Sequence, residues 1–368
     1  MFFLRIRWRL WLFILLLLFA IVGLGTFGVK NFLFYSQETE KPDRIKVVEG
    51  QLTFLALPHY IALTQGFYRE QNLEVETAVT NTPPEEQLNL KGQGDVFLGN
   101  LCQTVFTRPL GTGADLVAFG ALAQKEGAFL LSRKDDQKFS WENVKKKIIL
   151  GDAPDTQSNI ILEEALRQNN LALQHHVIIV QNLPSNLKEG AFQAGVAHYL
   201  QMPQPFAYQI QENQLGKIAI FLGDAVAPIP SLVILAPESY LKQHSKECQK
   251  LVNGLCKGLL WLDYHKPEEA TRVVASYFPE LDKKTLTAII KQYKELGMWG
   301  KNPLIAEEHY EHLKAYVSRA GELTNPVKFS DGVNNKLAKK AAKTVKYIPP
   351  EQQKEKTWWE KVKSLDFK

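Results

Sequence analysis

The sequence predicts an α/β protein that consists of two lobes and follows a membrane-inserting segment. A strand, a turn, a helix and a second strand can be read between Arg44 and Glu76, and parallel strands need such a crossover connection. Residues 44 to 332 have a globular composition and are too many for one typical hydrophobic core, which favours two lobes. Residues 10 to 29 carry no charge, as is typical of a segment that enters a membrane.

The first element is the βαβ unit. Its opening strand begins at Arg44, and the apolar run resumes at residues 52 to 57 after Gly50, until Pro58 ends it. From Tyr60 to Glu70 the apolar residues recur at helical spacing. After that helix, Leu73 and Val75 begin a new alternation, so we expect the second strand there.

Residues 1 to 30 are expected to insert into the membrane. The uncharged run is long enough to cross the roughly 30 Å hydrocarbon core at about 1.5 Å per residue. Arginines precede it, so the N-terminus should be cytoplasmic and the rest of the chain extracytoplasmic. The run exceeds the roughly 7 to 15 apolar residues of a signal peptide and no A-x-A site follows it, which favours an anchor over a cleaved signal. Residues 31 to 43 are expected to be a linker.

The cysteine content argues against a fold built on disulfides. The three cysteines make an odd count, and Cys248 and Cys256 lie too far apart along a helix for a disulfide. Neither a CxxC pair nor a His-rich spacing suggests a metal site, so we expect no metal and no cofactor. The positive charge is concentrated at the C-terminal end. Residues 331 to 368 contain ten lysines and five acids, an excess that equals the net charge of +5 of the whole chain. We expect these residues to form a basic, flexible tail. We expect a monomer with no nucleic-acid partner.

Four segments in order resemble one known family. The motifs are Pro58-His59-Tyr60-Ile61-Ala62 with Gly66-Phe67-Tyr68 and Asn72 to Glu76, then Gly92 to Asn100, then Ser140 to Val144, then Gly195 to Ala207. They look like the substrate-binding proteins of ABC importers for nitrate, sulfonates, taurine and thiamine-pyrimidine precursors. The last motif also echoes Gly92 to Leu98 of the first lobe. Three residues depart from the family pattern: Lys146 stands in place of glycine, His198 in place of aspartate and Gln204 in place of glutamate.

The resemblance implies a type II periplasmic-binding-protein fold, with two α/β lobes, a hinge and an interlobe ligand cleft. Residues 44 to 133 and 229 to 330 would form lobe 1, and residues 134 to 228 would form lobe 2. Helices are expected at residues 241 to 263, 267 to 278, 283 to 295 and 305 to 320. The implied partners are a small-molecule ligand and the permease and ATPase subunits of an ABC importer. The chain itself has no phosphate-binding G-x-x-x-x-G-K-[ST] loop.

Ligand-binding candidates follow from the ends of the expected strands. The loop from Asp152 to Ser158 joins a strand to a helix N-terminus, which can cap the helix or hold an anion. Asp152 and Asp155 in that loop suit an amine or a ring nitrogen better than a bare anion. The candidates are Phe54, His59, Gly99, Asn100, Leu101, Asp152, Thr156, Gln157, Ser158, Gln201 and Pro203. With Tyr199, they favour a nitrogen heterocycle over a sulfonate, although the residues alone do not separate the two.

Two further functions stay open. A catalytic descendant of the fold could act on a thiamine or menaquinone precursor, but the cysteine-rich motif of the pyrimidine synthases is absent between Cys102 and Cys248. A cytoplasmic menaquinone enzyme would not need residues 10 to 29. An anchored ligand sensor would need a partner, because no kinase or cyclase region follows the lobes. The sequence therefore favours a binding protein over an enzyme.

Overall fold

The computed structural model describes residues 41–81, 95–106, 116–133, 138–154, 156–321 and 327–352. The described residues from Asp43 onward form one compact unit. The predicted membrane segment and most of the predicted linker lie outside the described residues. Within the described ranges, no helix is long and apolar enough to cross a membrane.

The predicted βαβ unit is confirmed, but its helix begins and ends earlier than the predicted residues 60 to 70. Strand β1 (Asp43–Glu49) leads through α2 (Leu57–Thr64) and the short 3-10 helix η2 (Arg69–Gln71) into β2 (Leu73–Val79). The two strands pair in parallel from Asp43 with Leu73 to Glu49 with Val79. Asn72 has a left-handed backbone, with φ of 52°, at the point where the helical segment turns into β2.

The prediction that residues 52 to 57 continue the first strand is wrong. Residues 54–56 form the 3-10 helix η1 (Phe54–Ala56), and α2 begins at Leu57. The side chain of Thr53 accepts a hydrogen bond from the Leu55 amide and so caps this turn. Pro58 lies in the first turn of α2, where a missing amide hydrogen costs nothing, so the proline starts the helix and does not end a strand.

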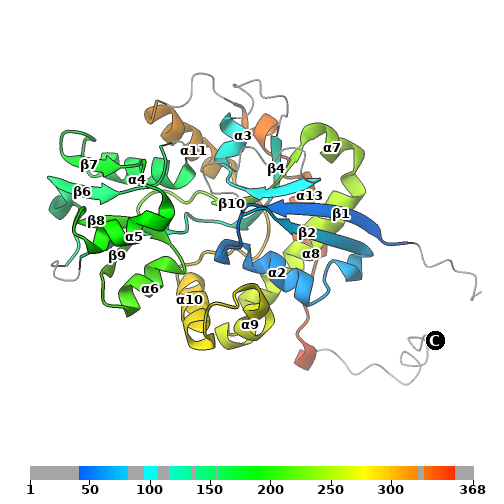
Figure 1. Cartoon of the computed structure of the whole chain (residues 1–368). Helices are drawn as coiled ribbons and strands as arrows, with labels where there is room; N and C mark the ends of the chain where they lie inside the picture. Colours follow the sequence, from blue (N-terminus) through cyan, green and yellow to red (C-terminus); the bar gives the residue numbers. More distant parts are fainter. Residues whose placement is uncertain are drawn as a thin grey trace, which may run out of the picture. The chain divides into compact units, whose positions relative to one another are not determined.

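Two mixed sheets with the same strand pattern form the framework (Figure 1). The first has the order β2-β1-β3-β10-β4, with β3 (Val96–Gly99), β4 (Leu116–Ala123) and β10 (Leu232–Pro237). The second has the order β7-β6-β8-β5-β9, with β5 (Ala128–Ser132), β6 (Lys147–Leu150), β7 (Val177–Val180), β8 (Tyr199–Pro203) and β9 (Lys217–Phe221). In each sheet three parallel strands are followed by two strands joined through antiparallel pairing. Strands β3 and β8 are equivalent, as the internal sequence echo indicated.

The pairing of β5 moves one lobe boundary. Ala128 to Ser132 pairs with β8 and β9 and therefore belongs to the second sheet, whereas the prediction kept residues up to 133 in lobe 1. The chain crosses between the sheets at residues 124–127, one strand earlier than predicted. It returns between the 3-10 helix η5 (Leu222–Asp224) and β10. The position of this crossing could not be predicted from the sequence, because β4 and β5 on either side of it are both buried and apolar.

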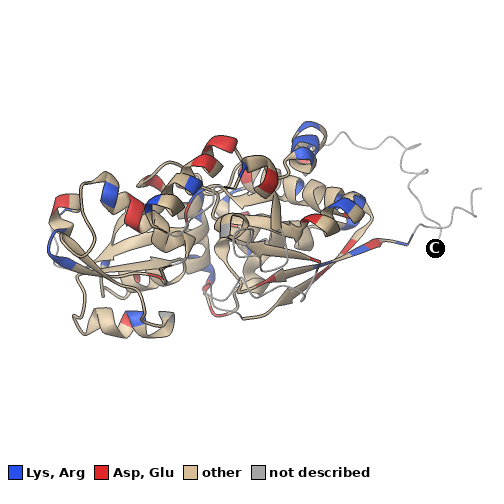
Figure 2. Ribbon diagram, turned by 90° about the horizontal axis from the view of Figure 1, so that it is seen from above, with Lys and Arg blue, Asp and Glu red and all other residues tan. Residues whose placement is uncertain are grey.

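Helices surround both sheets, and Figure 2 shows the charged residues concentrated on them while the strands are mostly uncharged. The helices are α3 (Cys102–Phe106), η4 (Trp141–Val144), α4 (Gln157–Gln168), α5 (Ser185–Gln193), α6 (Phe206–Glu212), α7 (Glu238–Gln243), α8 (Ser245–Tyr264), α9 (Pro267–Val274), η6 (Ala275–Tyr277), α10 (Lys283–Glu295), α11 (Glu307–Arg319), α12 (Phe329–Gly332), α13 (Lys336–Thr344) and η7 (Pro350–Gln352). The expected helix at 283 to 295 is confirmed at both ends. It begins at Lys283 because Asp282 caps the first turn of α10 through Oδ1. The helix expected at 241 to 263 is broken at His244 into α7 and α8.

Helix α11 joins the lobes. Its apolar face, which includes Leu313 and Tyr316, packs in one core cluster with Ile161 of α4. Arg319 of α11 also donates two hydrogen bonds to Glu164 of α4, at 3.0 and 2.6 Å. Trp261 and Trp299 serve as packing residues, and the indole of Trp299 contacts the ring of Tyr293.

The predicted flexible tail is wrong for residues 331 to 352. Val333 forms an isolated parallel β-bridge with Ala118 of β4. The side chain of Asn335 accepts a hydrogen bond from the Ile305 amide and donates one to the Ile305 carbonyl oxygen. Helix α13 buries Ala338 and Ala341 completely, because their spacing places both on one face while the lysines face outward. The basic composition therefore describes the outer face of a folded helix. Residues 353 to 368 of the predicted tail lie outside the described residues.

Candidate functional site

A cavity of about 460 Å³ opens between the two sheets. Its wall is built by loops that follow the parallel strands of both lobes, together with both crossing segments. Ligands in open α/β sheets bind outside the carboxyl ends of the strands, which is where this cavity lies. The lining residues are Glu49 to Thr53, Leu55, Leu98, Asn100, Glu126 to Ala128, Asp152, Ala153, Thr156, Ser158, Gln181 to Pro184, Lys188, Pro203 to Phe206, Ser231 and Leu232.

Glu49 is the last residue of β1 and stands on the first-lobe wall of the cavity. Only 2% of its surface is exposed. Oε2 accepts a hydrogen bond from the Tyr60 hydroxyl at 2.6 Å, whereas Oε1 is buried without a hydrogen-bonding partner among the described residues. Burial raises the pKa of Glu49 to about 7, although the bond from Tyr60 opposes the shift.

Glu126 lies in the crossing segment between β4 and β5 and also lines the cavity. Its Oε1 accepts a hydrogen bond from the Ala128 amide at 3.2 Å. Burial raises the pKa of Glu126 to about 7, and the charge of Asp152 adds to the increase, while hydrogen bonds from Ala128 and Ser158 oppose it. The cavity thus holds one buried carboxyl group on the first lobe and another on the crossing segment.

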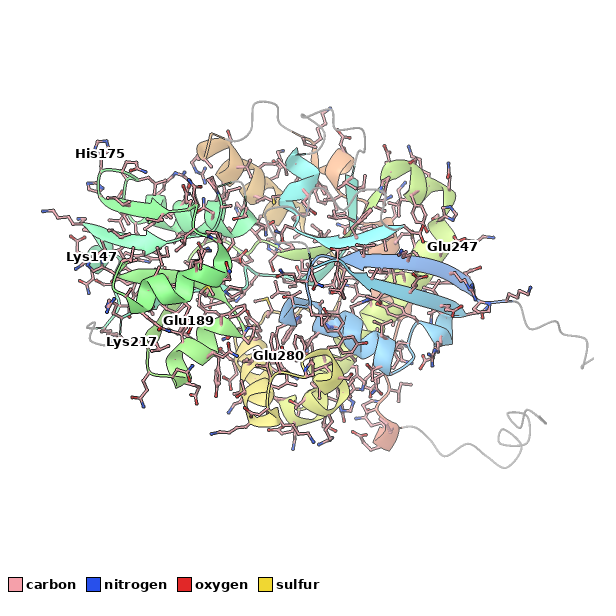
Figure 3. The ribbon with its side chains drawn as sticks, in the orientation of Figure 1. Lys147, His175, Glu189, Lys217, Glu247 and Glu280 are labelled. Atoms are coloured by element: carbon pink, nitrogen blue, oxygen red, sulfur yellow. The ribbon has the colours of Figure 1, made fainter. Side chains whose placement is uncertain are left out.

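Asp152 and Lys188 form an ion pair on the second-lobe wall. Asp152 follows β6, and Lys188 projects from α5 with only 2% of its side chain exposed. Lys188 donates to Oδ1 of Asp152, so the positive charge that α5 brings to the cavity already has a counter-ion. Lys147 and His175 of this lobe lie at its outer end, away from the first sheet (Figure 3).

Gln201 of β8 holds the loop that carries Asp152. The side chain is fully buried, and its Oε1 accepts a hydrogen bond from the Asp152 amide at 3.2 Å. Its Nε2 donates to the carbonyl and hydroxyl oxygens of Ser158, at 2.9 and 2.8 Å. Gln201 therefore positions two lining residues without lining the cavity itself.

The loop before α4 uses its own acceptors to cap the helix. Thr156 Oγ1 accepts from the Asn159 amide at 3.3 Å, and the Thr156 carbonyl accepts from the Ile160 amide at 3.1 Å. Gln157 points away from the cavity, with its Oε1 accepting from the Cys102 amide and its Nε2 donating to the Pro230 carbonyl. The first turn of α4 is thus tied to the first lobe and to the returning crossing segment.

The structure separates the predicted site residues into three groups. Asn100, Asp152, Thr156, Ser158 and Pro203 lie on the cavity wall. Gly99, Leu101, Gln157 and Gln201 lie next to or behind that wall as buried support. Phe54 and His59 lie in the hydrophobic core and not at the cavity.

The placement of Phe54 and His59 corrects the prediction. Phe54 belongs to a 3-10 turn and stacks on Phe278, with ring centroids 4.4 Å apart. His59 lies in α2, where its Nδ1 is hydrogen-bonded to the Tyr68 hydroxyl at 2.7 Å. Burial lowers the pKa of His59 to about 3, so the ring is neutral near pH 7. Both errors follow from reading residues 52 to 57 as a strand that ended at the cleft.

Sequence reasoning missed the two buried glutamates and Lys188. Glu49 ends an apolar strand just before Gly50, and Glu126 precedes Gly127 between two apolar strands. An acid at the end of an apolar run is the signal that could have identified both. Lys188 offered no such signal, because one lysine on an amphipathic helix is usually exposed.

The described residues hold no group of three or more His, Cys, Asp and Glu side chains that could bind a metal ion. Among these residues, the polar lining of the cavity consists of carboxyl, amide, hydroxyl and ammonium groups. Such groups can bind an organic molecule by hydrogen bonds and charge.

Comparison with known proteins gives the same architecture. The chain is 24% identical to YtlA of Bacillus subtilis (strain 168) over 305 residues, which is 83% of this chain and 91% of YtlA. It is similar in structure to the ligand-binding component of an ABC-type import system from Staphylococcus aureus, with a TM-score of 0.65 and 16% identity over 81% of this chain and 99% of that one. It is also similar to the periplasmic aliphatic sulphonate-binding protein SsuA from Escherichia coli, with a TM-score of 0.63 and 15% identity over 78% of this chain and 96% of that one.

These two solved structures fix the fold as a periplasmic-binding-protein-like arrangement of two α/β lobes. The family model described as "NMT1/THI5 like" matches residues 54–270, which include most of both lobes and the cavity wall except Glu49 to Thr53. The chain therefore belongs to the NMT1/THI5-like family.

Proposed function

We propose that this protein is the extracytoplasmic solute-binding component of an ABC importer and not an enzyme. In this role it captures a small organic nutrient between its lobes and presents it to a permease, which an ATPase subunit drives. The observation that carries the proposal is the cavity between two equivalent sheets, lined by loops from both lobes. The similarity to the ABC import component from Staphylococcus aureus and to SsuA supports it.

The crossing segments supply a hinge in this proposal. Lys125, in the first crossing, donates to Asp224 Oδ1 at 2.6 Å and to the Leu296 carbonyl at 2.9 Å. Ser231, in the returning segment, donates to the Lys125 carbonyl at 2.5 Å. The two crossing segments are thus bonded to each other, so they bend as one unit when the lobes close.

Ligand binding and closure are linked through contacts with both lobes. A ligand that bridges Asn100 of the first lobe and Ser158 of the second gains its full set of contacts only in the closed form. This difference in contacts shifts the equilibrium toward closure. The closed surface is then what the permease recognises. Residues 10 to 29 would hold the protein at the outer face of the membrane.

The proposal is tested by deleting the gene and measuring nutrient uptake. We expect uptake of one nutrient to be lost and to be restored by a plasmid copy of the full chain. A copy carrying Asn100→Ala should restore less uptake at limiting nutrient, whereas the surface variant Glu142→Gln should restore it fully. Unchanged uptake of every nutrient, together with a lost transcriptional response to one of them, would indicate an anchored sensor and contradict the importer role.

A further inference from the structure

We propose that the cavity binds a small organic cation with N–H donors, an amine or an amidine, and that Glu49 and Glu126 hold its nitrogen atoms. This inference rests on the proposed function, because it names the ligand class of the same cleft. It concerns recognition only, since no bond of the ligand is made or broken.

The charge of the cavity wall favours a cation. Among the described lining residues, three carry carboxyl groups, Glu49, Glu126 and Asp152, and one carries a positive charge, Lys188. Asp152 is paired with Lys188, so these two charges offset each other. The remaining charge that a ligand can complement is that of the two glutamates.

The bonding of Glu49 identifies the kind of group that it binds. One carboxyl oxygen accepts from Tyr60, and the other is buried and has no partner in the described part of the chain. A buried acceptor without a donor is unfavourable, so the ligand-free cavity retains an unmet requirement for a hydrogen-bond donor. An N–H group of a ligand satisfies it, and a positive charge strengthens the bond. A sulfonate or nitrate would bring only more acceptors.

Three groups that could hold an anion are already engaged within the protein. Lys188 is bound to Asp152, the Asp152 amide donates to Gln201, and the Asn159 amide donates to Thr156. The loop before α4 was the anion cradle that the sequence suggested as one alternative. In the structure, its helix cap is supplied by its own threonine.

A cation also explains how binding would drive closure. Glu49 stands on the first lobe, Glu126 on the crossing segment and Asp152 on the second lobe. Asp152 is offset by Lys188, so the charges left without a counter-ion when the lobes approach are those of Glu49 and Glu126, and their proximity is unfavourable in a low-dielectric cavity. A bound cation replaces this repulsion with attraction and therefore stabilises the closed form more than the open one.

The test uses calorimetric titration of the full chain with matched probes of opposite charge. The aromatic pair is benzamidine and benzenesulfonate, and the aliphatic pair is propylamine and propanesulfonate. We expect the cation of at least one pair to bind and its sulfonate partner not to bind. Glu49→Gln and Glu126→Gln should each weaken binding of that cation about tenfold or more, because each loses a charge-assisted hydrogen bond. Glu142→Gln, on the exposed surface, should leave it unchanged.

The outcomes separate this inference from the proposed function. Tighter binding of either sulfonate overturns the cation class and leaves the solute-binding role intact. Failure of both cations to bind also overturns it, and the uptake experiment then decides the role independently. Cation binding that neither glutamine variant weakens overturns the assignment of Glu49 and Glu126.

Discussion

Tyr60 donates its hydroxyl hydrogen to Oε2 of Glu49 over 2.6 Å, and this bond joins the core helix α2 to the wall of the ligand cavity. The same hydroxyl oxygen accepts a hydrogen bond from the Thr53 amide at 3.2 Å. The orientation of Glu49 is therefore fixed from inside the first lobe before any ligand enters. Fixed orientation lowers the entropy cost of binding a ligand to the free carboxyl oxygen.

The first prediction concerns stability and pH. In the unfolded chain a glutamate loses its proton near the ordinary pKa of 4.5, whereas burial holds the pKa of Glu49 and of Glu126 at about 7 in the folded protein. The folded state thus binds more protons between these values. The stabilising contribution is fully present below about pH 4.5 and is lost as the pH rises through about 7.

Glu49→Gln removes this dependence at one site. At about pH 8 we expect the free energy of unfolding of the ligand-free variant to exceed that of the wild-type protein by on the order of 2 kcal/mol, with a correspondingly higher Tm. At about pH 4 the two proteins should be equally stable. The groups that face Glu49 are Tyr60 and Tyr277, and neither titrates in this range because burial raises the pKa of both hydroxyls. Calorimetric unfolding at the two pH values checks this, and an equal effect at both would contradict it.

The second prediction compares a positioning residue with a lining residue. Gln201→Ala removes three hydrogen bonds that hold Asp152 and Ser158. We expect it to lower the free energy of unfolding by roughly 1 to 3 kcal/mol and to weaken ligand binding. Asn100→Ala should weaken binding by a similar amount with little change in stability, because Asn100 is only partly buried and faces the cavity. Unfolding and binding measurements on both variants should separate these effects.

The third prediction concerns the ion pair between α11 and α4. Arg319→Met leaves Glu164, which is 3% exposed, without its two strongest hydrogen bonds. Arg319 is 49% exposed, and Glu164 keeps a hydrogen bond from Gln168 and a 3.8 Å contact with Arg167, so we expect a loss of about 2 kcal/mol in free energy of unfolding. Arg44→Met is the matched control, because Arg44 pairs with Glu74 at the surface, where both side chains are more than half exposed. Its effect should stay below about 1 kcal/mol, and similar losses in urea unfolding for both variants would refute the contrast.

The fourth prediction uses two glycines. A Cβ atom on Gly223 would lie 2.5 Å from the Glu126 carbonyl oxygen, so Gly223→Ala must displace the backbone of the crossing segment. We expect a loss of stability of about 1 to 3 kcal/mol together with weaker ligand binding, because Glu126 moves. Gly190→Ala in α5 meets no atom within 4 Å and should be neutral or slightly stabilising. Binding by Gly223→Ala at wild-type strength would show that Glu126 does not hold the ligand.

Local patterns predicted those parts of the fold that local interactions determine. The parallel register of β1 and β2 follows from one helix between two apolar alternations, and α10 begins and ends where its cap and apolar stripe indicate. Residues 52 to 57 were misread because a short apolar run cannot by itself distinguish a strand from a turn that enters a buried helix. Residues 331 to 352 were misread because the fully buried positions of α13 are only two alanines, with Leu337 partly buried beside them.

The candidate site was harder to predict, because it depends on convergence of distant segments. Asn100, Asp152 and Ser158 could be named since each follows a strand that aligns with a family motif. Glu49 and Glu126 belong to no motif, and their proximity to the cavity arises only when β1 and the first crossing segment meet in space. Their burial, which makes them chemically distinctive, is a tertiary property.

The most direct test of the account is a thermal-shift screen of the full chain at near-neutral pH. The panel comprises amines, amidines, thiamine precursors and flavins, together with sulfonates, nitrate and bicarbonate. A ligand at one hundred times its Kd adds about 2.7 kcal/mol to the free energy of unfolding, which is a measurable rise in Tm. The account predicts such a rise with a nitrogen-containing cation, and a smaller rise in Asn100→Ala at the same ligand concentration. Folded protein whose Tm no compound changes would contradict a solute-binding role for the cleft.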